Sequence, residues 1–123
     1  MNKPILLCLH GWGGSKESFT ELRAAMQGSD YELLTPDLPG FGAEPEPPEP
    51  WTVENYAQWV TQWLTSRYTE KELQERSLSL LGHSHGGRIA IWITTHHLLP
   101  VSKLYLCASA GIKHARHVKR IIG

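Results

Sequence analysis

Short, unbroken apolar runs alternate along this chain with stretches in which apolar residues recur every three or four positions. An unbroken run bounded by turn residues is typical of a strand buried on both faces, whereas the wider spacing is typical of an amphipathic helix. The predicted strands are residues 4–9, 31–35, 77–81 and 101–108. The predicted helices are residues 15–26, 52–67 and 88–97. Thr52 is a favourable N-cap for the second helix.

This alternation predicts the fold class. Strands separated by helices pair in parallel, because each crossover returns the chain to the same end of the sheet. We therefore expect an α/β protein with a mostly parallel sheet of about four strands and flanking helices, a three-layer sandwich. Residues 37–50 are expected to form a loop, and its proline-rich part, residues 45–50, is expected to be extended and exposed.

The composition is that of one small globular domain. The 123 residues are 41% hydrophobic and 20% charged, which is typical of globular proteins. The apolar runs are too short to cross a bilayer, and residues 1–4 lead into a strand without the pattern of a signal peptide. We expect a single domain over residues 1–123, a cytoplasmic location and no membrane association.

Charge is uneven along the chain although it sums to zero. Residues 1–60 hold 3 basic and 9 acidic side chains, and residues 61–123 hold 9 basic and 3 acidic ones. The basic tail could attract an anionic partner, but such tails are usually solvated surfaces, so we expect no nucleic-acid binding. Cys8 and Cys107 lie in apolar runs and are expected to be core residues. We expect no metal site and no cofactor.

One motif suggests catalysis. Gly82-His83-Ser84-His85-Gly86 has the form G-x-S-x-G and lies between a predicted strand and a predicted helix. In that context the serine projects from a sharp turn, and the two glycines remove side chains that would clash where strand and helix approach. Ser84 is the candidate nucleophile. The alternative is an ordinary serine N-cap on a glycine-rich turn.

A second glycine-rich loop supports the first. Residues 10–15 follow the first predicted strand, at the sheet edge where residues 82–86 also lie. Glycines there would let a main-chain N–H point at a developing oxyanion. A phosphate-binding loop is the alternative, but neither the P-loop pattern nor the dinucleotide-binding pattern is present.

Three segments together resemble the α/β-hydrolase fold superfamily: His10-Gly-Trp-Gly-Gly-Ser15, Pro36-Asp-Leu-Pro-Gly-Phe-Gly42 and Gly82-His-Ser-His-Gly-Gly87. The resemblance is greatest to short-chain carboxylesterases and carbon–carbon bond hydrolases. It implies that Ser84 is the nucleophile and that the backbone N–H groups of Trp12 and His85 form the oxyanion hole. His10, Gly11, Gly82 and Gly86 would support the loop and the turn.

The chain departs from that family in its second half. Family triads run in the order Ser, acid, His, yet no Asp or Glu follows Glu75. The chain resembles the N-terminal half of a hydrolase, an incomplete α/β-hydrolase core in which residues 109–123 begin a cap or a tail. Asp37 precedes the nucleophile and matches a structural loop residue of the family.

None of the other histidines is a convincing base. A base must approach the serine hydroxyl within about 3 Å. The side chains of the two histidines on either side of Ser84 should diverge from that hydroxyl. His10 should brace its loop. His96 and His97 lie far down the next helix, and the remaining two lie in the basic tail. Trp12 and Trp51 are expected to line the substrate cleft, and the tryptophans within predicted helices are expected to pack against the core.

The predicted function is a serine hydrolase of carboxylic esters or related acyl bonds that forms an acyl-enzyme on Ser84 and is incomplete in this chain. The alternatives are an inactive truncated α/β module that binds a small molecule or a protein, and an anion-binding basic tail. The expected partners are a small ester or acyl substrate and a complementary C-terminal half, or a second copy joined through an edge strand.

The resemblance also implies a strand order. It places residues 4–9 centrally, with residues 31–35 and 77–81 on either side and residues 101–108 beyond. Cys8 and Cys107 would then be too far apart for a disulfide. The last strand would present an unpaired edge, which favours association with another chain.

Overall fold

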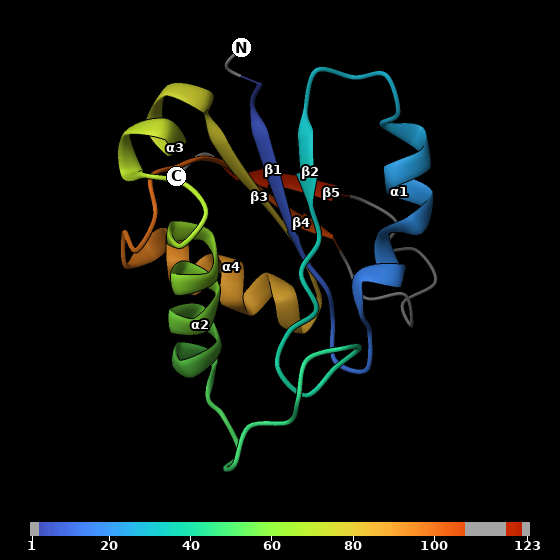
Figure 1. Ribbon diagram of the computed structural model, residues 1–123, viewed down its shortest axis with the longest axis vertical. Coiled ribbons are helices and arrows are strands. Elements are labelled where there is room, and N and C mark those ends of the chain that lie inside the picture. Colours follow the sequence, from blue (N-terminus) through green and yellow to red (C-terminus); the bar gives the residue numbers. More distant parts are fainter. Residues whose placement is uncertain (1–2, 108–117, 122–123) are drawn as a thin grey trace.

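The computed structural model describes residues 3–107 and 118–121 (Figure 1). Its strands are β1 (Ile5–Leu9), β2 (Glu32–Leu34), β3 (Leu78–His83), β4 (Val101–Cys107) and β5 (Val118–Ile121). Its helices are the 3-10 helix η1 (Lys16–Phe19) and the α-helices α1 (Thr20–Ala25), α2 (Val53–Thr65), α3 (Glu70–Arg76) and α4 (His85–Thr95).

The strands form one sheet in the order β2-β1-β3-β4-β5. β1 is parallel to both β2 and β3, and β4 is parallel to β3. The predicted α/β class and the predicted order of the first four strands are confirmed. Cys8 and Cys107 are free thiols on β1 and β4, with β3 between them, so the absence of a bond between them is confirmed as well.

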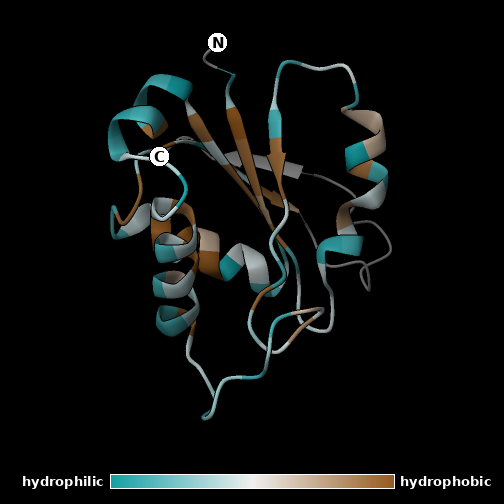
Figure 2. Ribbon diagram, viewed as in Figure 1, coloured by the Kyte–Doolittle hydropathy of each residue, from teal (hydrophilic) through white to brown (hydrophobic). Residues whose placement is uncertain are grey.

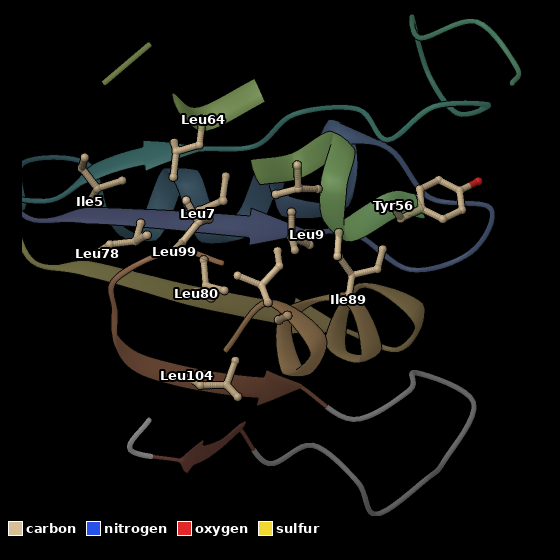
Figure 3. Close-up of a cluster of buried hydrophobic side chains, with 14 of the residues drawn as sticks. Ile5, Leu7, Leu9, Tyr56, Leu64, Leu78, Leu80, Ile89, Leu99 and Leu104 are labelled. Atoms are coloured by element: carbon tan, nitrogen blue, oxygen red, sulfur yellow. The ribbon is translucent and has the colours of Figure 1, made fainter. Parts of the chain in front are cut away.

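Helices cover both faces of the sheet (Figure 1). Alternate residues of a strand point to opposite faces, and on β1 they divide two hydrophobic clusters. Ile5, Leu7 and Leu9 pack with buried residues of α2 and α4 in the larger cluster (Figure 3). Leu6 and Cys8 pack with Phe19 at the end of η1 in the smaller one. The central strands are correspondingly the most hydrophobic part of the fold (Figure 2).

The prediction of an unpaired edge on the fourth strand is wrong. β5 runs antiparallel to β4 and pairs with it from Leu104, opposite Ile121, to Cys107, opposite Val118. A strand edge offers unpaired N–H and C=O groups, and here the chain itself returns to satisfy them. The basic residues of the tail hid the β-branched Val118 and Ile121 that suit a strand. Residues 108–117 and 122–123, the rest of the predicted cap or tail, lie outside the described residues.

Other differences concern helices. α3 was not predicted, although Thr69 and Glu72 form a capping box that marks its start, because only Leu73 in it is buried. α4 begins at His85 rather than at residue 88, directly after the serine turn. α2 begins after Thr52, whose side chain caps it as predicted. Within the described residues, no helix is both long and apolar enough to cross a bilayer.

Candidate functional site

Ser84 lies on the sharp turn between β3 and α4, and its side chain is exposed. Its backbone has φ 57° and ψ −117°, a conformation that L-residues rarely adopt. The N–H groups of Gly87 and Arg88 donate to the Ser84 carbonyl at 2.8 and 3.3 Å, which starts α4 immediately. The Ser84 side chain makes no capping hydrogen bond. An ordinary serine N-cap is therefore not what this residue provides.

Two glycines allow the turn to be this tight. A Cβ on Gly82 would lie 2.5 Å from the carbonyl oxygen of Gly86. A Cβ on Gly86 would overlap the carbonyl oxygen of Leu9 at the end of β1. Both distances are below any tolerable contact, so α4 can begin against β1 and β3 only because these residues have no side chain. The predicted need for glycine at both positions is thus met by the packing.

The loop after β1 packs directly against Ser84. The N–H of Gly14 donates to the carbonyl of Gly11 at 2.9 Å, and Gly13, with φ 80°, supplies the left-handed position of this turn. A Cβ on Gly11 would lie 3.1 Å from the Cβ of Ser84. The two glycine-rich segments, 71 residues apart from Gly13 to Ser84, therefore meet at the carboxyl ends of β1 and β3.

His10 braces this loop. Its ring is fully buried, with Nδ1 2.9 Å from the carbonyl oxygen of Gly11 and Nε2 2.9 Å from the backbone nitrogen of Leu38. Because a carbonyl accepts and an N–H donates, the ring carries its proton on Nδ1 and is neutral. Burial lowers the pKa of His10, against the raising effects of Gly11 and Asp37. The ring therefore joins the loop after β1 to the loop of residues 37–50.

Asp37 holds the third motif segment in place. Its carboxylate accepts from the backbone N–H of Lys16 at 2.6 Å and of Ala43 at 3.0 Å. Burial opposes ionisation, but these two hydrogen bonds outweigh it and lower the pKa of Asp37. Gly42, at φ 56°, leaves no room for a Cβ beside this carboxylate. Asp37 thus has the structural role that the resemblance implied.

The two residues predicted as oxyanion donors lie side by side. The rings of Trp12 and His85 meet edge to face, with centroids 5.1 Å apart. His85 is the first residue of α4, so its backbone N–H belongs to the N-terminal groups that have no acceptor within the helix. Burial, and then the positive charge of Arg88, lower the pKa of the His85 ring. The rings of Trp12 and His85 thus form an aromatic wall next to the exposed Ser84.

A cavity of about 350 Å³ opens beside this wall. It is lined by Trp12, Gly40, Phe41, Glu46, Pro47, Pro48, Glu49, Pro50, Trp51 and Tyr56. Ser84 does not line it, but Trp12 and Tyr56 both contact the ring of His85, the next residue along the chain. The cavity therefore adjoins the ring of the residue that follows the candidate nucleophile in the chain.

The cavity settles the expectations for the aromatic residues. Trp12 and Trp51, which are expected from the sequence at the substrate cleft, line this cavity, and the helical tryptophans, Trp59, Trp63 and Trp92, pack against the core as predicted. Phe41 and Tyr56 were not predicted for the site. Tyr56 has core spacing on α2, and its hydroxyl donates to the carbonyl of Pro39 in the loop at 3.2 Å. The proline-rich segment is mostly exposed, yet it forms one wall of the cavity.

Among residues 3–107, no histidine ring is hydrogen-bonded to the Ser84 hydroxyl. There, the recorded hydrogen bonds of histidine rings join His10 to its two loops and His96 to Thr95 and Trp92. The described residues thus bring together Ser84, both glycine-rich segments and the aromatic wall, and they leave the serine hydroxyl without a histidine partner. His114 and His117 lie outside the described residues.

Known proteins resemble this chain in sequence and in fold. Lipase 1 of Psychrobacter immobilis is 32% identical over 125 residues, which cover 98% of this chain and 36% of the lipase. The 2-succinyl-6-hydroxy-2,4-cyclohexadiene-1-carboxylate synthase of Pectobacterium atrosepticum is 36% identical over 90 residues, 73% of this chain and 32% of the synthase. The solved structure of MenH from S. aureus superimposes with a TM-score of 0.69 at 26% identity, over 93% of this chain and 41% of that protein.

The chain spans about a third of the length of the curated relatives it matches. The model of the family described as "alpha/beta hydrolase fold" matches residues 4–120, which is nearly all of this chain. Glycine-rich turns, strand order and sequence agree, and the chain belongs to the α/β hydrolase fold family.

Proposed function

We propose that this chain carries the nucleophile and the oxyanion hole of a serine hydrolase that cleaves carboxylic esters or related acyl bonds. The observation that carries the proposal is Ser84, an exposed serine held at φ 57° at the start of α4 with the loop after β1 packed against it. Strained residues of this kind persist where the surrounding structure enforces them, and they gather at catalytic sites. The similarity to a lipase supports an ester substrate.

In the proposed reaction, Ser84 Oγ forms a bond to the carbonyl carbon of the ester while its proton passes to a base. The carbonyl π electrons move to oxygen, and the backbone N–H groups of Trp12 and His85 stabilise that oxyanion, assisted by the N-terminus of α4. Collapse of the intermediate expels the alcohol, which takes the proton from the base. Water then attacks the acyl-enzyme by the same route and releases the acid.

The proposal assigns the base and its acid partner to residues that are not part of this chain. None of the described histidine rings is recorded in a hydrogen bond with the Ser84 hydroxyl, and the relatives are about three times as long as this chain. Enzymes that lack their triad but keep the oxyanion hole retain about 10³- to 10⁴-fold acceleration over water. We therefore expect residues 1–123 alone to hydrolyse activated phenyl esters barely above background.

The test is a chimera in which residues 1–123 replace the matched third of the Psychrobacter immobilis lipase. A fluorophosphonate probe should form an adduct with Ser84 of the chimera, located by mass spectrometry, and ester hydrolysis should appear with it. Ser84→Ala should abolish both, whereas Ser66→Ala, which removes an exposed helix-end hydroxyl, should change neither.

A chimera with native circular dichroism that stays unlabelled would contradict the proposal. It would favour the other reading, an α/β module that binds a small molecule or a protein without catalysis. Vigorous hydrolysis by residues 1–123 alone, lost on substitution of one of the chain's histidines, would show instead that the base lies within this chain.

A further inference from the structure

The cavity beside the rings of Trp12 and His85 is lined by both aromatic and acidic side chains. Its aromatic side is formed by Trp12, Phe41, Trp51 and Tyr56. The rings meet edge to face: Trp12 and Phe41 have centroids 5.0 Å apart, and Trp51 and Tyr56 have centroids 5.2 Å apart. The faces of aromatic rings carry partial negative charge, so a set of rings around one space attracts a cation.

The proline-rich part of the lining carries two carboxylates. Glu46 and Glu49 lie in that segment, and both side chains are exposed. Among the described residues, the recorded ion pair is Arg76 with Glu32, so neither glutamate is neutralised by a basic partner there. No lysine, arginine or histidine of the described part of the chain lines the cavity. Arg88, on α4, is exposed and acts on His85 from outside it.

The carboxylate charge extends to the aromatic wall. After burial, the negative charge of Glu46 is the second cause that raises the pKa of the Tyr56 hydroxyl. The prolines between the two glutamates restrict their backbone, which reduces the conformational entropy lost when a ligand binds. The aromatic rings, and the carboxylates that have no basic partner among the described residues, both favour positive charge in the same space.

From this we infer that the cavity selects substrates whose acyl or alcohol part carries a quaternary or tertiary ammonium group. A trimethylammonium group is bulky and weakly hydrated, so the rings can surround it at small desolvation cost while Glu46 and Glu49 supply charge complementarity. Two of the lining rings, those of Trp12 and Tyr56, contact the ring of His85, which follows Ser84 in the chain, so such a group would belong to an ester whose scissile bond reaches Ser84. The substrate class rests on the proposed function, whereas the binding of the cation does not.

Binding is tested on the full chain with two probes of the same shape. 3-(Trimethylammonio)phenol and 3-tert-butylphenol differ in charge and hardly in size, and calorimetry or quenching of tryptophan fluorescence reports their affinities. We expect the cation to bind about 3- to 10-fold more tightly than its neutral counterpart. Equal or tighter binding of 3-tert-butylphenol would overturn the inference and identify an ordinary apolar acyl pocket.

Variants locate the effect. Glu46→Gln combined with Glu49→Gln should remove most of the preference for the cation and leave the affinity for 3-tert-butylphenol unchanged. The control, Glu44→Gln combined with Glu54→Gln, changes net charge by the same amount at glutamates that do not line the cavity, and the preference should persist. A preference that falls equally in both double variants would show a general charge effect and contradict the assigned site.

The substrate class is tested in the active chimera with a choline ester and the matching 3,3-dimethylbutyl ester. We expect kcat/KM to favour the choline ester about 3- to 10-fold, and the Glu46→Gln, Glu49→Gln variant to lose that ratio. Hydrolysis of both esters without a preference would contradict this inference and leave the proposed function intact. Cation-selective binding without hydrolysis or labelling would support the binding of the cation and contradict the proposed function.

Discussion

The two ends of the sheet are built on opposite principles. At the carboxyl ends of β1 and β3, glycines and the strained Ser84 pack main chain against main chain, and α4 begins without a side-chain cap. At the amino ends, Arg76 forms an ion pair with Glu32 on β2, and the Tyr68 hydroxyl donates to the same carboxylate at 2.8 Å.

The amino-end cluster is satisfied throughout. Arg76 Nε donates to the carbonyl of Lys3 at 2.8 Å, and its guanidinium lies over the Tyr68 ring, 5.1 Å from the centroid. The hydrogen bond from Arg76 is the main cause that lowers the pKa of Glu32. One end therefore joins β2, α3 and the segment before β1 through satisfied polar contacts, whereas the other holds a strained residue at the start of α4.

The largest effect is expected from Gly86→Ala. The added Cβ would overlap the carbonyl oxygen of Leu9, and the main chain on both sides has nowhere to move, so the free energy of unfolding should fall by about 3 kcal/mol or more. Gly87→Ala is the matched control, because its Cβ would meet nothing closer than 3.4 Å. Urea denaturation measures the stability of both variants, and equal midpoints would contradict the packing described for the turn between β3 and α4.

His10→Phe should have the next largest effect. Phenylalanine fills a similar volume, but it leaves the carbonyl of Gly11 and the N–H of Leu38 without their buried partner. Each lost hydrogen bond costs about 1–2 kcal/mol, so we expect a loss of about 2–3 kcal/mol in urea denaturation. Labelling of Ser84 in the chimera should slow too, because the loop that holds Trp12 loses its brace. Unchanged stability would show that water replaces the ring.

Arg76→Leu tests the amino end. We expect a loss of only about 1 kcal/mol in the free energy of unfolding, because the Glu32 side chain is 37% exposed and solvent screens the pair. Labelling of Ser84 in the chimera should be unchanged. A slower reaction would show that the two ends are coupled through the sheet, which the comparison above does not predict.

Ser84→Gly should change stability in the opposite direction. Glycine adopts φ 57° freely, so relief of strain should exceed its entropic cost and raise the free energy of unfolding by about 0.5–1 kcal/mol. Ser77→Gly is the matched control, since Ser77 has φ 62° at the amino end of β3. Both variants should gain stability and only Ser84→Gly should lose labelling. Destabilisation by Ser84→Gly alone would mean that the serine side chain supports the turn.

The smallest effect is a pH dependence at the carboxyl end. Burial lowers the pKa of His10 and of His85 in the folded chain, so the unfolded chain binds more protons as the pH falls. Their contribution to stability is complete above the unfolded value of about 6.5 and is lost as the pH falls below it through the folded pKa. Urea midpoints from pH 7.5 to 5 should decline less in His10→Phe than in the wild type. Identical slopes would contradict a buried neutral ring.

Local sequence determined the turns and their chemistry. A G-x-S-x-G motif between an apolar run and a helix predicts the elbow at Ser84, because only glycine permits such close approach of main chains. In the same way, the alternation of strands and helices predicts the parallel sheet, since the periodicity of apolar residues and the turn residues are local properties of the sequence. The resemblance added the order of β2, β1, β3 and β4, which no local property contains.

The tertiary structure alone decided which distant residues share a surface. Tyr56 has the spacing of a core residue on α2, yet its ring ends beside His85 and lines the cavity, because α2 packs against α4, whose first residue is His85. β5 was hidden in a basic tail, since strand pairing depends on the free edge of β4 and not on charge. Periodicity reports which face of an element is apolar, but the contacts across elements arise from packing that no single segment encodes.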